Sequence, residues 1–271
     1  MSPIAEKNMQ VHNFTNNDRE RQRSPEEWSE NFTYAYFRKI CQVTKSNFEI
    51  YRVFEAALAL NSSKTPKLIL RHDVDVSLER ALPMAAIEHD YKIASTYLVN
   101  PNCQFYDLQD PVSRRILQEL LSMGHEVGLH FDHPCREQGK FLSYEREIHL
   151  AKGKLAAIIG RPVLSFSTHR PQYQPLYSQL MVQGMVNSYA PKLMQWYLSD
   201  SLGRWREGEP LPKLRQPANP LLQLLIHPIW WGEVHLSAVD RKNELVEYCI
   251  RGRDPRYQEA FHRALTLDLG L

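Results

Sequence analysis

The sequence predicts an α/β fold in which a parallel β-sheet closes into a barrel or curls strongly. Short apolar runs alternate with amphipathic segments of helix length over most of the chain. This alternation is typical of βαβ units, whose right-handed crossovers bring successive strands side by side in parallel. About seven of the runs have strand length, a number that suits a barrel or a strongly curled sheet. Ionisable residues follow several of these runs, which is where such folds place their sites.

Composition and charge exclude several classes of protein. The 271 residues are 43% hydrophobic and 24% charged, which is enough for one large core. Residues 1–28 contain few large apolar groups, so we expect a flexible tail followed by a single domain over 29–271. The formal net charge of +2 argues against nucleic acid or an anionic membrane as partner.

The expected location is the cytoplasm. No apolar run reaches the ~18 residues of a membrane-spanning helix, and the polar N-terminal segment lacks the apolar core of a secretory signal. The cysteines lie far apart and form no CxxC pair, so we expect reduced thiols rather than a disulfide framework or a zinc site. These cysteines are Cys41, Cys103, Cys135 and Cys249.

In the first half of the chain, spacing and turn residues predict the elements in order. Apolar residues at helical spacing predict two short helices, one after Phe32 and one around Val53. The apolar run 68–70 predicts a core strand. A helix is expected between Ser77 and His89, with its start delayed or kinked by Pro83. The following apolar run predicts a strand over 93–99.

In the second half, caps define the elements more sharply. Asp110 and Pro111 predict a helix start, and Gly124 its end. Gly160 likewise closes a predicted helix over 142–159. The remaining apolar runs predict strands at 126–130, 162–168, 185–189, 195–199 and 221–226. A last helical region is expected over 237–265, broken near Gly252 and Pro255.

A pair of aspartates follows the first core strand. Side chains on a strand alternate between its faces, so Asp73 and Asp75 point to the same side. Two neighbouring carboxylates repel each other unless a cation, a proton or an arginine lies between them. The segment 71–75, Arg-His-Asp-Val-Asp, therefore indicates metal binding and general acid–base chemistry.

Other predicted strands end in residues of the same chemical kind. They are His130, Asp132 and His133, then His169 and Arg170, then Asp200 with Arg204 and Trp205, and finally His227 with Trp230 and Trp231. Taken singly, each has an ordinary structural explanation, such as a turn, a core histidine or a core aromatic ring. Because the carboxyl ends of parallel strands meet at one rim, their joint occurrence there favours a functional site over coincidence.

These residue types suit metal-assisted hydrolysis. One carboxylate and two neutral imidazoles are common ligands of a catalytic divalent metal, and they leave positions open for water and substrate. A second carboxylate can take a proton from water, and an imidazole can protonate the leaving group. An arginine keeps the base ionised, and a carboxylate beside the acid histidine raises its pKa and fixes its tautomer. No phosphate-binding glycine loop and no GxSxG elbow is present.

The ordered motifs resemble the NodB-homology polysaccharide deacetylases of the carbohydrate esterase type. Within that family they resemble a divergent branch linked to surface-polysaccharide biosynthesis. The motifs are LRHDVD (70–75), STYLV (95–99), GHEVGLH (124–130), FSTHRP (166–171), SDSLGRW (199–205) and IHP (226–228). The resemblance implies a deformed seven-stranded (β/α) barrel and a metal-dependent deacetylase acting on an acylated sugar or polysaccharide precursor. It implies a divalent metal, with zinc expected and other divalent transition metals as alternatives.

The resemblance also implies a role for each matched position. It makes Asp73 the catalytic base, Asp75 and His130 metal ligands, and His227 the general acid. The supporting residues would be Arg170, which orients the base, Asp200, which tunes the acid, and Arg204, Trp205 and Trp230, which would line the substrate site.

Two departures from the family pattern leave alternatives open. The family has adjacent aspartates, whereas Val74 separates them here, so the base and ligand roles of Asp73 and Asp75 are interchangeable at this stage. The usual second histidine ligand lies four residues after the first, where this chain has Pro134. The missing ligand is then His133 or His169, and we favour His169 because it lies at a strand end.

Three functions remain in competition. The leading one is a metal-dependent sugar deacetylase. Exposed aromatic rings around the rim would support it, because such rings stack on the faces of sugars. The second is an amidase of the same fold acting on a small non-sugar amide, which a small closed pocket would favour. The third is a catalytically inactive carbohydrate-binding homologue, in which the side chains would lie too far apart to share a metal.

Overall fold

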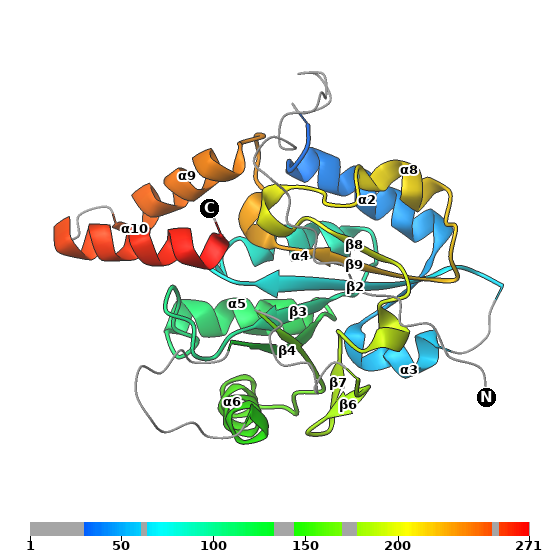
Figure 1. Ribbon diagram of the computed structural model, residues 1–271, viewed down its shortest axis with the longest axis horizontal. Coiled ribbons are helices and arrows are strands. Elements are labelled where there is room, and N and C mark those ends of the chain that lie inside the picture. Colours follow the sequence, from blue (N-terminus) through cyan, green and yellow to red (C-terminus); the bar gives the residue numbers. More distant parts are fainter. Residues whose placement is uncertain (1–29, 61–63, 133–143, 170–177, 251–254, 271) are drawn as a thin grey trace, which may run out of the picture.

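The computed structural model describes residues 30–60, 64–132, 144–169, 178–250 and 255–270 (Figure 1). The predicted tail over 1–28, together with His133, Cys135 and Arg170, lies outside the described residues. Within those ranges, no helix has both the length and the apolar character needed to cross a bilayer.

One sheet organises the described part of the chain. Its nine strands follow the order β6-β7-β5-β4-β3-β2-β9-β8, with β1 paired to β2 beside this path. All pairs are parallel except β6 with β7. The strands are β1 (Glu49–Tyr51), β2 (Lys67–Val74), β3 (Thr96–Val99), β4 (Glu126–Phe131), β5 (Ser165–Thr168), β6 (Met181–Val182), β7 (Met185–Asn187), β8 (Tyr197–Ser199) and β9 (Leu221–Ile226).

The sheet is curled but open, so the predicted closed seven-stranded barrel is not confirmed. Among the described residues, β6 and β8 end the strand order and do not pair with each other. Curling is evident from side chains: Arg71 Nη1 on β2 donates to Ser188 Oγ, just after β7, at 2.7 Å. Four strand positions separate β2 from β7, which would be ~19 Å in a flat sheet. The edge strands are too short to close the ring with backbone hydrogen bonds.

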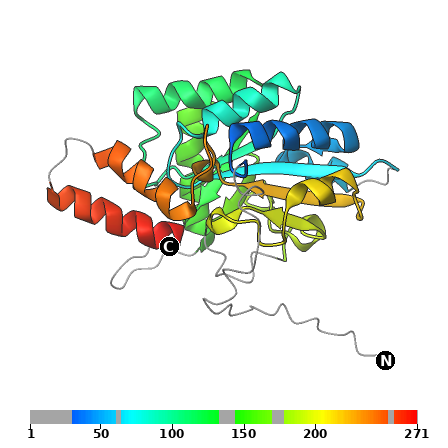
Figure 2. The same cartoon turned by 90° about the horizontal axis from the view of Figure 1, so that it is seen from above.

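Helices cover the outer face of the curled sheet. Neighbouring helices contact one another in the order α8, α2, α4, α5 and α6 around it. The helices are α2 (Tyr34–Asn47), α3 (Ala56–Ala59), α4 (Ala81–Asp90), α5 (Pro111–Ser122), α6 (Tyr144–Ile159), α8 (Pro210–Arg215), α9 (Ala238–Ile250) and α10 (Pro255–Leu269). Helices α9 and α10 lie side by side and extend beyond the body at the end where β2 finishes (Figures 1 and 2).

Local sequence signals explain most element boundaries. Asp110 caps α5, because its carboxylate accepts from the backbone N–H groups of Val112 and Ser113. Gly124 follows that helix with φ at 91°, a conformation that suits glycine. As predicted, Pro83 delays its helix: α4 begins at Ala81, which places the proline in the first turn.

Other predicted elements were displaced or missed. Strands expected from residues 93 and 162 begin three residues later, at Thr96 and Ser165. Strands β1 and β6 were not predicted, since each has three residues or fewer. Helix α8 was also missed: two prolines, at 210 and 212, mask its helical pattern.

The two faces of β2 carry different polar groups. The even-numbered His72 points toward the helices, where its Nε2 lies 2.7 Å from Glu88 Oε1 on α4. Glu88 also accepts hydrogen bonds from Ser95 Oγ at 2.6 Å and from Tyr97 OH at 2.8 Å. His72 and Glu88 are fully buried, so this pair ties α4 to the sheet from outside. The odd-numbered Arg71 points into the curl of the sheet, as do Asp73 and Asp75.

Gly128 on β4 marks a close approach inside the curled sheet. A Cβ at this position would lie 2.5 Å from Leu98 Cδ2 and 2.5 Å from Ser165 Oγ. We therefore expect Gly128→Ala to lower the free energy of unfolding by about 2 kcal/mol, measured by urea denaturation, because the neighbouring strands must move apart. Gly153→Ala is the matched control. Gly153 lies inside α6, where an added Cβ would meet no neighbour within 4 Å, so alanine should stabilise the helix by about 0.5–1 kcal/mol. An unchanged stability in Gly128→Ala would refute the close packing.

Candidate active site

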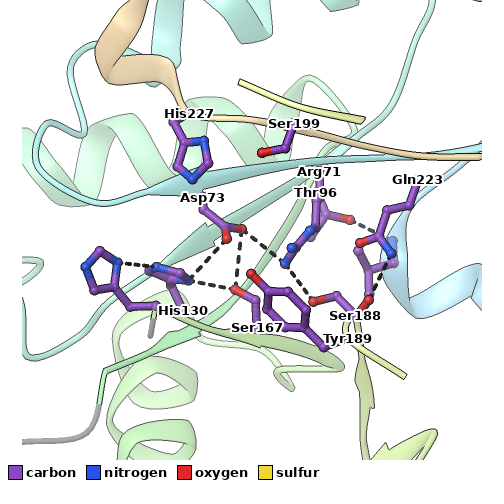
Figure 3. A network of polar contacts seen from close by, with 12 residues as sticks. Arg71, Asp73, Thr96, His130, Ser167, Ser188, Tyr189, Ser199, Gln223 and His227 are labelled. Carbon is purple, nitrogen blue, oxygen red and sulfur yellow. Dashed lines mark hydrogen bonds and ion pairs between the residues drawn. The ribbon is translucent and has the colours of Figure 1, made fainter. Parts of the chain in front are cut away.

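Polar side chains from four strands meet inside the curl near the carboxyl ends of the strands. Figure 3 shows Asp73, His130, Ser167 and His227 facing one another, with Arg71 on the side toward Ser188. The predicted convergence of strand ends is therefore observed for Asp73, His130 and His227, whereas Ser167 was not among the predicted residues. The convergence arises because β2, β4, β5 and β9 are parallel, so that their carboxyl ends lie at the same edge.

Asp75, His130 and His169 form a compact triad. Asp75 Oδ1 lies 2.9 Å from His130 Nε2 and 3.2 Å from His169 Nδ1. The two imidazole nitrogens are themselves 3.2 Å apart. Burial disfavours the charge on Asp75, but hydrogen bonds from His130 and His169 and the charges of His169 and His227 hold its pKa well below the usual range. The carboxylate is thus poised as an anion that faces two ring nitrogens.

The triad fits a divalent metal. Its three ligand atoms lie within 4.8 Å of one another, and all three side chains are largely buried. Ligands held 2.0–2.2 Å from a tetrahedral zinc lie roughly 3.3 Å apart, close to the spacings found here. One carboxylate with two imidazoles is also a donor set that leaves coordination positions open. Of the two candidates for the second histidine ligand, His169 is in the triad and His133 lies outside the described residues.

Asp73 lies beside the triad but belongs to a different set of contacts. Its Oδ1 accepts a long hydrogen bond from Ser167 Oγ at 3.4 Å, and its Oδ2 lies 3.7 Å from His130 Nδ1. Ser167 Oγ in turn lies 2.6 Å from His130 Nδ1. His130 therefore directs Nε2 to the triad and Nδ1 to Ser167 and Asp73, which fixes the orientation of its ring.

Arg71 lies behind Asp73, deeper in the curl. Its Nη1 is 3.4 Å from Asp73 Oδ1, and its guanidinium lies 4.6 Å from the centre of the Tyr189 ring. Arg71 is fully buried, so its charge is compensated mainly by Asp73. Arg170, the arginine expected beside the base, lies outside the described residues, so its role stays a prediction, and Arg71 is an additional arginine that was not predicted to lie here. The alternation of side chains on β2 could have found it, since positions 71, 73 and 75 share a face.

His227 and Asp200 form the opposite side of the site. His227 Nδ1 lies 2.6 Å from Asp200 Oδ1, and Asp200 Oδ2 accepts from Trp231 Nε1 at 2.8 Å. The other ring nitrogen, Nε2, faces Asp75 Oδ2 at 3.9 Å. Burial opposes the imidazolium, but Asp200, then Asp75 and Asp73, outweigh it and raise the pKa of His227 to about 9. A protonated His227 is therefore favoured at neutral pH.

One acidic residue at the site was not foreseen. Asp268, in the last turn of α10, places Oδ1 3.4 Å from His169 Nε2. Burial disfavours charge on His169, yet the hydrogen bonds that its ring donates to Asp268 and Asp75 raise its pKa to about 11. The surrounding carboxylates thus favour positive charge at the triad, the same sign that a divalent cation would bring. The last helix was expected to end near residue 265, whereas α10 continues to Leu269. The sequence pattern did not indicate that these additional residues would reach the site.

The residues predicted to bind substrate are arranged differently from expectation. Trp205 and Trp230 are only 4% and 3% exposed and belong to the hydrophobic core. The Trp205 ring stacks on Phe32, and its Nε1 donates to Asn31 Oδ1 at 3.1 Å. Neither tryptophan offers a free ring face to a sugar. Arg204 is partly exposed, and its role as a substrate contact remains a prediction.

Comparison with known proteins gives structural similarities of low score. No protein-family model matches the sequence, and no curated protein matches it. The chain is similar to the Streptococcus pyogenes deacetylase PplD in complex with acetate, with 15% identity, a TM-score of 0.41, and coverage of 76% of this chain and 87% of that chain. It is also similar to wild-type BA3943, a CE4 family pseudoenzyme from Bacillus anthracis, with 14% identity, a TM-score of 0.38, and coverage of 69% of this chain and 62% of that chain.

The chain is also similar in structure, at a comparably low score, to a mutant of BA3943 with restored enzymatic activity. Its identity to this chain is 15% and its TM-score 0.38, with 67% of this chain and 62% of that chain covered. This chain therefore spans 62% of the length of these BA3943 structures. The assignment of function rests on the geometry of the site.

Proposed function

We propose that this chain is a metal-dependent hydrolase that removes an acyl group, with the N-acetyl group of a sugar or polysaccharide precursor as the leading substrate. One observation carries the proposal. The Asp75–His130–His169 triad has a further carboxylate, Asp73, on one side and an Asp200-bound imidazole, His227, on the other. Those are the groups that hydrolysis of an amide requires: metal ligands, a base and an acid.

Asp75, His130 and His169 would hold the metal. When bound, a divalent metal such as zinc polarises an acyl carbonyl and lowers the pKa of water. Asp75 is assigned as the ligand rather than the base because it contacts both histidines of the triad. Of these two histidines, Asp73 approaches only His130, at the Nδ1 that points away from the triad. This assignment addresses the ambiguity that Val74 introduces between the two aspartates.

Asp73 would act as the general base. It lies beside the triad without belonging to it, so its carboxylate is available to accept a proton from a water molecule. Arg71 supports this role, because the buried guanidinium compensates the negative charge at Oδ1. Ser167 holds the same oxygen at 3.4 Å and helps to orient it.

His227 would act as the general acid. Its Nδ1–H donates to Asp200 Oδ1, which leaves Nε2 to carry the transferable proton toward the site. The backbone N–H of His227 donates to Asp200 as well, at 2.9 Å, and Trp231 fixes the second carboxylate oxygen. With its pKa raised to about 9, His227 is protonated at neutral pH and can donate to a departing amine.

The burial of the two tryptophans that were predicted to line the substrate site favours a second candidate, an amidase acting on a small non-sugar amide. Trp205 and Trp230 lie in the core, and α10 reaches His169 with Asp268. A site without those two exposed rings suits a small amide at least as well as an internal unit of a long polysaccharide. The inactive alternative is less favoured, because it expects side chains too far apart to share a metal, whereas the triad atoms lie within 4.8 Å.

Acyl release with and without metal tests the proposed function. The purified protein should release acetate from at least one member of a panel of N-acetylated sugar nucleotides, N-acetylated oligosaccharides and small non-sugar amides. Treatment with a chelator should abolish release, and added Zn²⁺ should restore it, because the substrate carbonyl depends on the metal for polarisation. Release from small non-sugar amides alone would select the second candidate. Activity that survives complete metal removal would overturn the proposal.

A further inference from the structure

The carboxyl-terminal helix reaches the proposed metal triad. Asp268 lies in the last turn of α10, and its Oδ1 is 3.4 Å from His169 Nε2. Both side chains are only 12% exposed. In Figures 1 and 2, α10 runs back toward the body, so that its C-terminal end meets the edge of the sheet where β2 finishes.

The two nitrogens of His169 face different partners. Nδ1 points to Asp75 Oδ1 and His130 Nε2, each at 3.2 Å, whereas Nε2 points to Asp268. A neutral imidazole has one N–H and one lone pair, and only the nitrogen with the lone pair binds a metal. A carboxylate that accepts from Nε2–H leaves the lone pair on Nδ1, which is the nitrogen directed at the triad.

Core contacts hold α10 in place. Phe261, Leu265 and Leu269 project from one side of the helix and are 8%, 0% and 3% exposed. All three belong to the hydrophobic core cluster that includes β2 and β9. The Phe261 ring also packs edge-on against Phe105, with ring centres 5.5 Å apart. Asp268 is adjacent to Leu269, so the buried helix face determines where its carboxylate lies.

We propose that Asp268 is a positioning residue for the metal site and that α10 is therefore part of the active site. Asp268 holds His169 in the tautomer and ring orientation that present Nδ1 to the metal. This proposal rests on the proposed function, because it takes Asp75, His130 and His169 as metal ligands. It adds a dependence of metal affinity on a residue that is not itself a ligand and belongs to a helix outside the sheet.

A simple structural role makes a different prediction. If the contact between Asp268 and His169 only fastens α10 to the body, its loss lowers thermal stability and leaves zinc affinity unchanged. If Asp268 positions a ligand, zinc affinity falls even in a protein that remains folded. Removal of such an outer partner typically weakens metal binding by about 10–100-fold.

Zinc affinity measured by competition with a chromogenic chelator distinguishes these cases. We expect Asp268→Ala to bind Zn²⁺ about 10–100-fold more weakly than the unaltered chain. Asp268→Asn should lose less, because the amide oxygen still accepts from Nε2–H. This variant also serves if the alanine protein fails to fold. The matched control is Glu259→Gln, which removes an exposed carboxylate from the same helix and should leave affinity unchanged.

The outcomes separate this proposal from the proposed function. Wild-type zinc affinity in folded Asp268→Ala and Asp268→Asn would overturn the positioning role and leave the metal site intact. An unaltered chain that binds no zinc or other divalent transition metal would instead overturn the proposed function, and the role of Asp268 with it. A fall in affinity shared by Glu259→Gln would also count against Asp268, since it would reflect the loss of any negative charge on α10.

Discussion

Replacing Asp75 with alanine is expected to weaken zinc binding by more than ~100-fold, the upper end for residues that merely support a ligand. Asp75 is the carboxylate that contacts both histidines of the triad, at 2.9 and 3.2 Å. Without Asp75, two neutral imidazoles remain to bind a dication. The negative charge that offsets the loss of the hydration shell of the metal is then missing. Hydrolysis should fall with metal occupancy.

The measurement is zinc affinity by chelator competition, with circular dichroism to establish folding. Asp90→Ala is the control, because Asp90 is an exposed carboxylate on α4, 67% exposed, and pairs only loosely with Arg38 at 3.7 Å. It should bind zinc as the unaltered chain does. If folded Asp75→Ala holds as much zinc as that control, Asp75 is not a ligand.

Replacing His227 with alanine is expected to lower turnover by about 10²–10⁴-fold while zinc affinity stays near that of the unaltered chain. His227 is not in the triad, and its Nε2 is 3.9 Å from the nearest oxygen of Asp75. Its proposed task is to donate a proton to the leaving amine, so its loss should affect kcat far more than metal binding. His149→Ala, which removes an exposed histidine from α6, is the matched control.

The Asp200→Asn variant tests the same role of His227 through the pH dependence of kcat. Asp200 is the leading group that raises the pKa of His227 to about 9, against the opposing effect of burial. A general acid must be protonated, so activity should fall as pH rises through that pKa. Asparagine removes the negative charge, lowers the pKa of His227, and should move the alkaline limb of the kcat profile to lower pH. An unmoved alkaline limb, or full activity in His227→Ala, would remove His227 from the mechanism.

The part of the site that lies on strand ends could be predicted from sequence. Asp75, His130 and His169 each lie at or just beyond the carboxyl end of a strand, and parallel strands bring these ends together whatever the exact loop geometry. The preference for His169 over His133 used the same rule. His169 is in the triad, whereas His133 lies outside the described residues, so the choice between the two stays a prediction. That preference needed no knowledge of loop conformation.

Groups beside these ligands were harder to predict because they come from less regular relations. Asp268 reaches His169 from the C-terminal helix, a tertiary contact with no sequence periodicity to reveal it. Burial of Trp205 depends on its stacking with Phe32, near the start of the described chain. The position of Arg71 could have been predicted, because Arg71 shares a strand face with Asp73. The family pattern instead assigned the arginine beside the base to Arg170.

The extent of sheet closure could not be predicted from strand number. Closure depends on edge strands that pair along their whole length, and β6 and β8 have two and three residues. Polar side chains close the interior instead. Gln223 on β9 donates to the backbone oxygen of Ser188 at 2.9 Å, and Arg71 donates to the hydroxyl of the same serine. These contacts join opposite arms of the curled sheet without backbone pairing.

The central claim is that Asp75, His130 and His169 bind one divalent metal. Anomalous diffraction at the zinc absorption edge, from crystals grown with one equivalent of Zn²⁺, tests it most directly. The expected result is a single anomalous peak within about 2.0–2.2 Å of Asp75 Oδ1, His130 Nε2 and His169 Nδ1. A strong peak elsewhere with none at this triad, or no peak at any protein site, would contradict it.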